Sequence, residues 1–269
     1  MQNDFKVTSQ NKIWFGYFAS FAQAGFTTAC SCRLHGESDI IPGILNLALH
    51  VGDDPEKALR NRAKFAEAIG VSADRFTTCA QVHGSKAQVV TEDLIGRGAL
   101  SFADTIPETD ALLTNLPNVP LLLFYADCVP VLLADPVTGA IGLAHAGWRG
   151  TAAQIAKKTV QAMVESFHVK PENLLGAIGP SIGACCYEVD DAVKEKMPAY
   201  HRHFTDKGHG KYWLDLWGVN RQQLLEAGLT SGHISVAGIC TSDNPELFCS
   251  YRYENGKTGR MGVCLCRKA

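Results

Sequence analysis

Three residues with metal-binding or nucleophilic side chains each follow a short apolar segment: His83, Cys128 and His145. Short segments rich in branched residues predict buried strands. Each side chain is therefore expected at a strand end, where the scaffold fixes its position and a loop leaves access. Two imidazoles and one thiolate form a donor set suited to a catalytic zinc ion with an open fourth position. The spacing alone does not distinguish such a triad from three unrelated core or surface residues.

Cys128 also admits a second interpretation, as a nucleophile. A cysteine with a nearby histidine and an orienting aspartate can attack a carbonyl carbon, and Asp127 directly precedes Cys128. Neighbouring residues on a strand point to opposite faces, so Asp127 need not share the site of Cys128. This interpretation predicts a cysteine hydrolase or amidase. In a third interpretation the chain is a binding protein and its metal is structural.

The segment after His145 reads Gly-Trp-Arg-Gly-Thr and leads into helical spacing. Free N–H groups at a helix start favour an anion, and Arg149 could add a bidentate contact to phosphate or carboxylate. A tight turn with a solvated arginine is an equally good interpretation. The small-residue loop 179–184 could admit a flat ring or a ribose, or merely turn the chain. Glu188 follows this loop and could act as an acid or base, or pair with a surface cation.

The elements that must position these residues are short strands mixed with helices. Edge strands are expected in residues 1–35, and further strands in 45–49, 77–82, 86–91, 109–114, 121–125, 131–134, 140–144, 174–179, 234–240, 247–251 and 260–265. Helical spacing and capping residues predict helices over 55–69, after residue 150, over 189–197 and over 215–227. Loops are expected over the polar residues 92–109 and 201–213. The irregular mixture indicates a layered α/β sandwich with mixed sheets and outer helices, in a single domain over residues 1–269.

Composition excludes several classes of function. The chain has 269 residues and a formal net charge of −2, so it lacks the excess positive charge typical of nucleic-acid-binding proteins. No apolar segment approaches the length of a membrane span, and the N-terminus lacks a signal-peptide pattern, so a cytoplasmic location is expected. Ten cysteines occur without a Cys-x-x-Cys pair. The Cys-x-Cys pairs at 30/32 and 264/266 are expected to be small hydrophobic strand residues.

Motifs spread from about residue 45 to residue 260 resemble one protein family. They are LNLALHVGDDP with the following NR, QVHG, TDALLT, ADCVPVLLADP, GLAHAGWRGT, IGPSIGACCYEVD, WLDL and SYRYENGKTGR. The chain resembles the laccase-domain, or multicopper polyphenol oxidase-like, proteins, now described as purine nucleoside phosphorylases. The N-terminal part departs from that family, because FTTACSCRLHGESD stands where an Arg-Gly-Gly-rich segment is usual.

The resemblance implies a single α/β sandwich domain with a zinc ion whose ligands map onto His83, Cys128 and His145. It implies phosphorolysis of adenosine, inosine, guanosine and methylthioadenosine, and deamination of adenosine. An editing role in peptidoglycan precursor synthesis is associated with the same similarity. The expected partners are purine nucleosides and phosphate, without nucleic acid or a membrane, and a monomer is favoured.

Roles for the remaining residues follow from these reactions. Arg149 and the helix start after Gly147 would hold phosphate, and Asn46 would contact the base or the ribose. Zinc lowers the pKa of a bound water, and zinc deaminases attack C6 of adenine with a carboxylate that moves protons. Asp127 and Glu188 are the candidates for this proton transfer, and Glu188 is also a candidate substrate contact.

The oxidase name fits the residues poorly. Multicopper oxidases need several His-x-His pairs, and this sequence has one, His201 and His203. A set of two histidines and one cysteine can hold a single copper ion. A copper-dependent polyphenol oxidase therefore stays an alternative, together with a cysteine amidase that edits peptidoglycan precursors.

Overall fold

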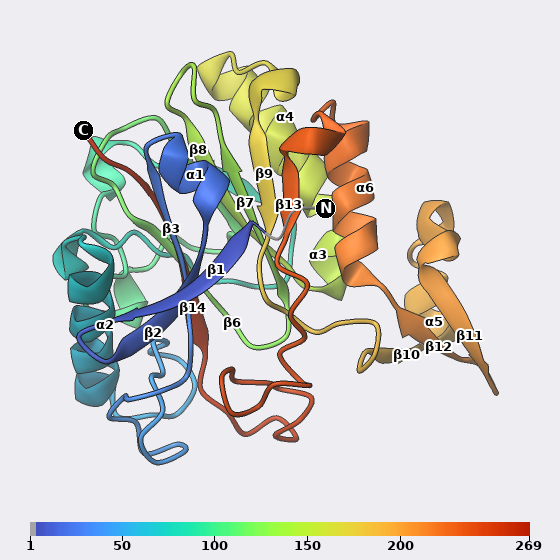
Figure 1. Cartoon of the computed structure of the whole chain (residues 1–269), viewed down its shortest axis with the longest axis horizontal. Coiled ribbons are helices and arrows are strands. Elements are labelled where there is room, and N and C mark those ends of the chain that lie inside the picture. The colour runs from blue at the N-terminus through green and yellow to red at the C-terminus, as the bar shows by residue number, and fades with distance from the viewer. Residues whose placement is uncertain (1–3) are drawn as a thin grey trace.

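Two large sheets lie face to face between helices in the computed structural model, which describes residues 4–269 (Figure 1). The first sheet is antiparallel, with the strand order β1 (Phe5–Gln10), β2 (Ile13–Phe18), β3 (Phe26–Ser31), β14 (Met261–Arg267) and β6 (Leu121–Tyr125). The second sheet is mixed, with the order β13 (Ile234–Val236), β9 (Leu175–Ile178), β7 (Val129–Ala134), β8 (Ile141–Ala146), β5 (Ala111–Thr114) and β4 (Ala87–Val89). These layers confirm the predicted α/β sandwich.

Alternation along β6 shows how the layers are held together. Leu121 and Leu123 point into the core between the two large sheets. Leu122 and Phe124 point to the opposite face and pack in the cluster that covers α2 (Pro55–Ile69). Because successive strand residues face opposite sides, one short apolar strand contributes to two cores. This explains why all its residues are buried.

Helices cover the far face of the six-stranded sheet. The helices α3 (Trp148–Ala152), α4 (Ile155–Phe167) and α6 (Leu216–Glu226) pack there in a third apolar cluster. The chain also contains α1 (Ala19–Gln23) and α5 (Asp191–Lys194). Short 3₁₀ helices occupy Ala73–Arg75, Glu92–Leu94, Phe102–Asp104, Pro171–Asn173, Pro198–His203 and Ser231–His233.

Capping residues set the ends of α2 as the sequence predicts. The carboxylate of Asp54 accepts a hydrogen bond from the backbone N–H of Glu56, and Pro55 occupies the first turn. Gly70 ends the helix at a φ of 70°, a left-handed conformation that costs glycine little. The predicted helix at 215–227 is likewise observed, with Asp215 accepting from the N–H of Gly218.

Three predicted strands are absent from the described residues. Segment 45–49 has no strand, although Leu45 and Leu47 are buried. Its N–H groups bond to carbonyls of two different segments, at Arg33 and Arg260, so no ladder forms. Segment 77–82 makes only isolated bridges, and 247–251 is a turn region. The prediction failed because apolar residues in a buried irregular segment have the same spacing as those of a strand.

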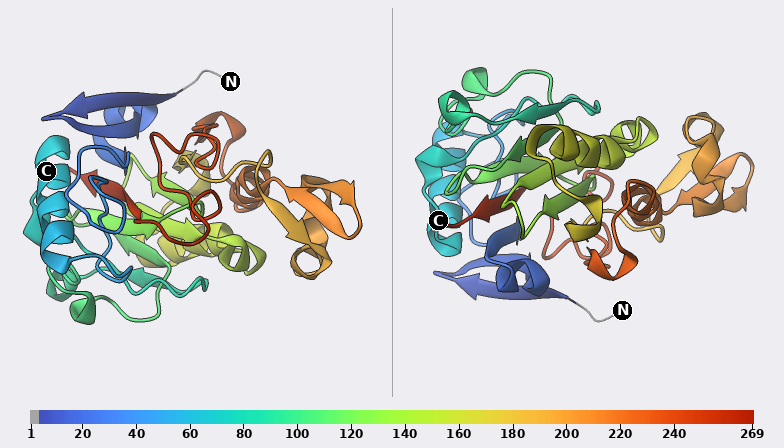
Figure 2. Two further views of the ribbon diagram at one scale, coloured as in Figure 1. Left: turned by 90° about the horizontal axis from the view of Figure 1, so that it is seen from below. Right: turned by 90° about the horizontal axis from the view of Figure 1, so that it is seen from above.

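The polar segment 201–213 was predicted as a loop, and that prediction was wrong. It contains a hairpin of β11 (Phe204–Gly208) and β12 (Lys211–Leu214), which pairs with β10 (Glu188–Asp190). This small sheet projects from the body of the molecule together with α5 (Figures 1 and 2). Most side chains of β11 are exposed, so the segment carries no apolar alternation to mark it as a strand.

Several element boundaries differ from those predicted. The helix expected after residue 150 begins earlier and is divided at Gln154, whose φ is 61°. The elements expected at 189–197 and 234–240 are shorter, as α5 and β13. All ten cysteines are free, and those of the two Cys-x-Cys pairs are buried, as predicted. In residues 4–269 no helix is both long and apolar enough to cross a membrane. The single-domain organisation stays a prediction.

Candidate metal centre and its cavity

The structure brings His83, Cys128 and His145 together. Each offers one ligand atom, and these three atoms lie within 4.8 Å of one another. The two imidazole rings have centroids 4.9 Å apart and an interplanar angle of 73°. These distances leave space for a single cation between the three donors. Their role as metal ligands is a proposal that this grouping supports.

Strand pairing explains the convergence of two of these residues. In the register of β7 and β8, Pro130 lies opposite His145 and Val129 lies opposite Ala146. Cys128 directly precedes β7, so its thiol lies beside the end of β8. A Cβ atom on Gly147 would lie 3.0 Å from the Cys128 sulfur and 3.1 Å from Cδ2 of His83. Glycine at this position therefore leaves room for both ligands.

Asp110 supports the cluster, and the sequence analysis assigned it no role. Its fully buried carboxylate lies 3.0 Å from Nδ1 of His145. It also accepts the backbone N–H groups of His83 at 3.0 Å and Gly84 at 2.7 Å. His83 has a φ of 60°, so these bonds stabilise an uncommon backbone conformation. With Nδ1 of His145 committed to Asp110, the other ring nitrogen is available to a metal, as in many metal sites.

A signal for Asp110 was present in the sequence. It directly precedes the buried strand β5 (Ala111–Thr114), within the family motif TDALLT. A carboxylate in such a position must be compensated by hydrogen bonds or an opposite charge. Burial raises the pKa of Asp110, but the His145 ring and the backbone N–H groups outweigh that effect and leave the pKa below its ordinary value.

The metal-free cluster favours a thiolate next to an imidazolium. Burial raises the pKa of the Cys128 thiol, but His145 and His83 lower it further, to about 6. Burial lowers the pKa of His145, but Cys128 and Asp110 raise it to about 9. The thiolate is the form that binds metals and attacks electrophiles. The metal-free cluster therefore has the protonation state required both for metal binding and for nucleophilic attack.

The cluster forms part of the wall of a cavity of about 620 Å³. Flat aromatic side chains and cations line much of the rest, namely Phe124, Tyr125, Trp148, Tyr187, Tyr251, Arg149, Arg252 and Arg260. His50 and Gln81 also line it. A cavity of this volume with aromatic walls and a few charged groups fits a nucleoside-sized ligand.

Arg149 differs from the other two arginines of the cavity. Arg252 donates to the backbone carbonyls of Cys186 and Glu188, both at 3.0 Å. Arg260 donates to nearby backbone carbonyls, and burial lowers its pKa. Arg149 makes no side-chain hydrogen bond or ion pair within the described part of the chain, and its guanidinium lies 4.4 Å from the Trp148 ring centre. It is therefore the arginine with donors free for an anion.

Asp127 lines the cavity, but its carboxylate is already engaged. One oxygen accepts from the Thr241 hydroxyl at 2.6 Å, and the other accepts from the Ser250 hydroxyl at 3.0 Å and the backbone N–H of Arg252 at 2.7 Å. Its φ of 79° places it in a tight turn between β6 and β7. These contacts favour a positioning role for Asp127 over proton transfer.

Asn46 and Glu188 lie outside the lining of this cavity. Asn46 is fully buried and its amide bonds to Ala48, Asp53 and the Arg260 N–H. Glu188 pairs with Lys207 on the projecting sheet, and this hydrogen bond lowers its pKa. Both side chains have structural partners that explain them. The structure therefore offers no direct substrate contact for either residue in this cavity.

His50 is a cavity residue to which the sequence analysis assigned no role, although it follows the LNLAL motif. Its ring centroid lies 5.0 Å from that of Phe102 and 6.1 Å from that of Phe124. Burial, with added repulsion from Arg260 and Arg62, lowers its pKa to about 4. His50 is therefore neutral at pH 7 and can exchange hydrogen bonds with a ligand without carrying charge.

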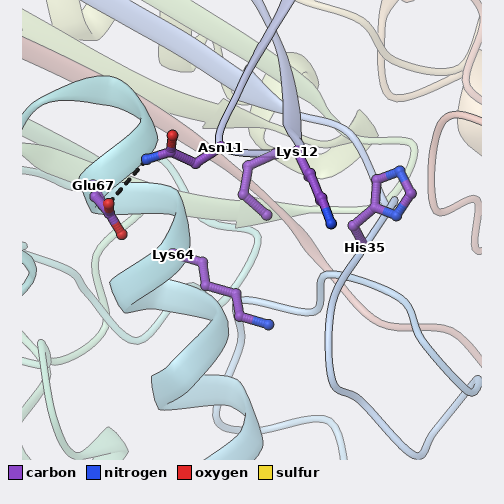
Figure 3. A pocket seen from close by; sticks show the side chains of 6 residues that line it. Asn11, Lys12, His35, Lys64 and Glu67 are labelled. Atoms are coloured by element: carbon purple, nitrogen blue, oxygen red, sulfur yellow. Dashed lines mark hydrogen bonds between the residues drawn. The ribbon is translucent and has the colours of Figure 1, made fainter.

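Another cavity, of about 320 Å³, lies between the β1–β2 turn and α2 (Figure 3). Its lining includes Asn11, which donates to Glu67 at 2.9 Å, and Lys64, which pairs with Glu37 at 2.6 Å. Its polar groups are thus largely paired with the protein. The single His-x-His pair also lies away from the larger cavity, in the 3₁₀ helix Pro198–His203. These residues do not bring a second histidine cluster to the candidate site.

Two named proteins are similar to this chain over most of its length. A protein of Geobacillus stearothermophilus named purine nucleoside phosphorylase YlmD is 43% identical over 92% of this chain and 90% of its own length. The Bacillus subtilis protein of the same name is 38% identical, with coverages of 88% and 86%.

Solved structures of similar proteins have nearly the same fold as this chain. The crystal structure of YlmD from Geobacillus stearothermophilus has a TM-score of 0.93 at 38% identity, covering 98% of this chain and 99% of that one. The Bacillus licheniformis protein YfiH also has a TM-score of 0.93, at 35% identity and coverages of 99% and 100%. A family model matches residues 27–268. The chain therefore belongs to the family described as multi-copper polyphenol oxidoreductase laccase, in which similar members are named purine nucleoside phosphorylases.

Proposed function

We propose that this chain is a zinc-dependent purine nucleoside phosphorylase that accepts adenosine, inosine, guanosine and methylthioadenosine and also deaminates adenosine. One observation carries the proposal: His83, Cys128 and His145 meet in the wall of a cavity that also presents the uncommitted Arg149. The names of the similar proteins support the phosphorylase reaction.

The donor set fits zinc. Two imidazoles and a thiolate leave an open position in a tetrahedral site, and Asp110 fixes the ring of His145 as metal sites require. Zinc, when bound, supplies a Lewis acid at the cavity wall. The same donors suit a single copper ion, so metal content has to be measured and not assumed.

Different side chains of the cavity would bind the phosphate and the purine during phosphorolysis. A phosphate oxygen must form a bond to C1′ of the ribose while the N-glycosidic bond breaks and the purine leaves with its electron pair. Arg149 would bind phosphate through two parallel N–H donors. Tyr187 and Phe124 offer aromatic faces to the purine. Burial keeps the pKa of Tyr187 above its ordinary value, so its hydroxyl retains a proton and can donate it as a hydrogen bond to the leaving base.

A second candidate is favoured by one specific observation. Cys128, His145 and Asp110 form a thiolate, imidazolium and carboxylate series, with Asp110 in the orienting role that the sequence had suggested for Asp127. A cysteine amidase acting on peptidoglycan precursors would use these residues without metal. It predicts activity that survives a chelator and covalent trapping of Cys128 in the metal-free protein.

The decisive experiment compares the zinc-loaded chain with His83→Ala and with His209→Ala, an exposed histidine of the β11–β12 turn. Each protein is incubated with adenosine, with and without phosphate. We expect adenine only when phosphate is present, inosine under both conditions, and loss of both products in His83→Ala alone. If the zinc-loaded chain forms neither product, the proposal fails.

A further inference from the structure

A second group of metal-binding side chains lies on loops outside the triad. Cys185 and Cys186 occupy the turn between β9 and β10, and Cys240 and Asp243 follow β13. Strand-like contacts hold these two segments together, because the N–H of Ser181 donates to Ile239 at 3.2 Å and that of Thr241 donates to Ser181 at 3.1 Å. Residues far apart in the sequence are therefore adjacent here.

The four ligand atoms of this group all lie within 4.8 Å of one another. The Cys186 sulfur is 3.5 Å from an oxygen of Asp243. The N–H of Gly183 donates to the Cys240 sulfur at 3.2 Å, a contact that fixes the position of this sulfur. A Cβ atom on Gly183 would lie 3.2 Å from the Cys185 sulfur. The absence of a side chain at Gly183 therefore leaves space for the Cys185 thiol.

The chemistry of these donors selects the ligand class. The three thiolates are soft donors, and the carboxylate adds a fourth anionic ligand. Because sulfur donors dominate, the set suits a thiophilic divalent cation and not magnesium or calcium. Four protein donors complete a tetrahedral shell, which is typical of a structural zinc site. Cys240 is buried, whereas Cys185 and Asp243 are exposed, so an ion can enter from solvent.

We propose that Cys185, Cys186, Cys240 and Asp243 bind a zinc ion at a site separate from the His83–Cys128–His145 cluster. This ion would tie the loop that carries Cys185 and Cys186 to the segment that follows β13. Tyr187 follows Cys186 directly, and Arg252 donates to the Cys186 carbonyl at 3.0 Å. Both Tyr187 and Arg252 line the cavity. The second ion would therefore stabilise the cavity wall from outside without contacting substrate.

The test measures metal stoichiometry in the full chain under a reductant, so that all thiols stay free. Apo protein is loaded with Zn²⁺, freed of excess ion and analysed for zinc. We expect about two ions per chain in the wild type and about one in both Cys128→Ser and the double variant Cys185→Ser/Cys186→Ser. Loading with Co²⁺ distinguishes the sites, because thiolate-to-cobalt absorption should be lost mainly in the double variant.

A double variant that retains the wild-type zinc content and cobalt spectrum overturns the proposal, whether the wild type holds about one ion per chain or about two. Asp243→Asn provides a second variant that removes only an exposed donor, and it should weaken the second ion while circular dichroism stays unchanged. Stoichiometry does not depend on turnover, so this result is independent of whether the chain phosphorolyses nucleosides.

Discussion

The two thiol-containing clusters differ in the number of donors and in what holds those donors in place. The His83–Cys128–His145 cluster has three donors, held by strand ends and by the buried Asp110. The Cys185–Cys186–Cys240–Asp243 cluster has four donors carried by loops. Three protein ligands leave a position for substrate, whereas four complete the shell. Donor count and support therefore separate a site arranged for reaction from one arranged for cross-linking.

The two clusters also differ in their position relative to the cavity. All three residues of the first cluster line the cavity of about 620 Å³, and none of the four residues of the second does. The second cluster reaches the cavity only through its neighbours, such as Tyr187. If this comparison is right, substitutions in the first cluster should abolish the reaction. Substitutions in the second cluster should instead make the cavity wall less stable.

The largest effect is expected from His145→Ala. This change removes a ligand and the partner of both Cys128 and Asp110, so we expect phosphorolysis to fall roughly 10³-fold or more. Cys185→Ser should lower the rate far less. Initial rates of adenine release, measured for both variants at saturating phosphate, check the contrast. Comparable losses in the two variants would contradict the division between a reacting and a cross-linking cluster.

Asp110→Asn tests whether the Asp110 carboxylate holds the His145 ring in place for metal binding. Removal of a carboxylate partner of a metal-bound histidine typically weakens metal affinity about 10- to 100-fold. We expect a loss of this size for the ion at His83, Cys128 and His145, measured by competition with a chelator. Asp243→Asn is the matched change in the second cluster and should leave this affinity unchanged. An Asp110→Asn variant with wild-type affinity would show that backbone pairing alone orients His145.

The part of the site that sequence could predict was the part carried by reactive residues at strand ends. His83, Cys128 and His145 have side chains whose chemistry is recognisable in isolation. The role of Asp110 depends on the antiparallel pairing of β5 with β8, which places Ala111 opposite Ala144. No local pattern encodes that register. The partners of Asn46 are likewise hidden from the sequence, because its buried amide bonds to Ala48, Asp53 and the distant Arg260.

The fold shows the same division between local and long-range information. Capping by Asp54 and Gly70 predicts α2 because the signals lie beside the helix. Segment 45–49 was misassigned because its alternating leucines belong to an irregular segment that packs between distant parts of the chain, with residues 45–48 all buried. The exposed β11–β12 hairpin had no apolar pattern, although Gly208 and Gly210 mark its turn with φ values of 87° and 69°.

Thiol reactivity should separate the two clusters by pH. In metal-free protein the fraction of Cys128 thiolate rises through a midpoint of about pH 6, so alkylation by iodoacetamide should be near its plateau at neutral pH. Burial and the adjoining thiols raise the pKa of Cys185, which should react only in more alkaline solution. Peptide mass spectrometry of alkylated protein across a pH series gives both midpoints. Indistinguishable midpoints would remove the electrostatic contrast between the clusters, and added zinc should protect Cys128.

Arg149→Ala leaves both clusters intact, so a smaller effect is expected from it than from His145→Ala. Loss of a charge-assisted contact to phosphate costs about 1.5–3 kcal/mol, so KM for phosphate should rise roughly tenfold or more. Deamination of adenosine, which uses no phosphate, should change little. Arg202→Ala, an exposed arginine of the 3₁₀ helix Pro198–His203, is the matched control. Glu188→Gln should also leave both rates near wild type, because Glu188 lies outside the cavity lining. If KM for phosphate stays constant in Arg149→Ala, phosphate binds elsewhere in the cavity, and Arg252 and Arg260 become the residues to test.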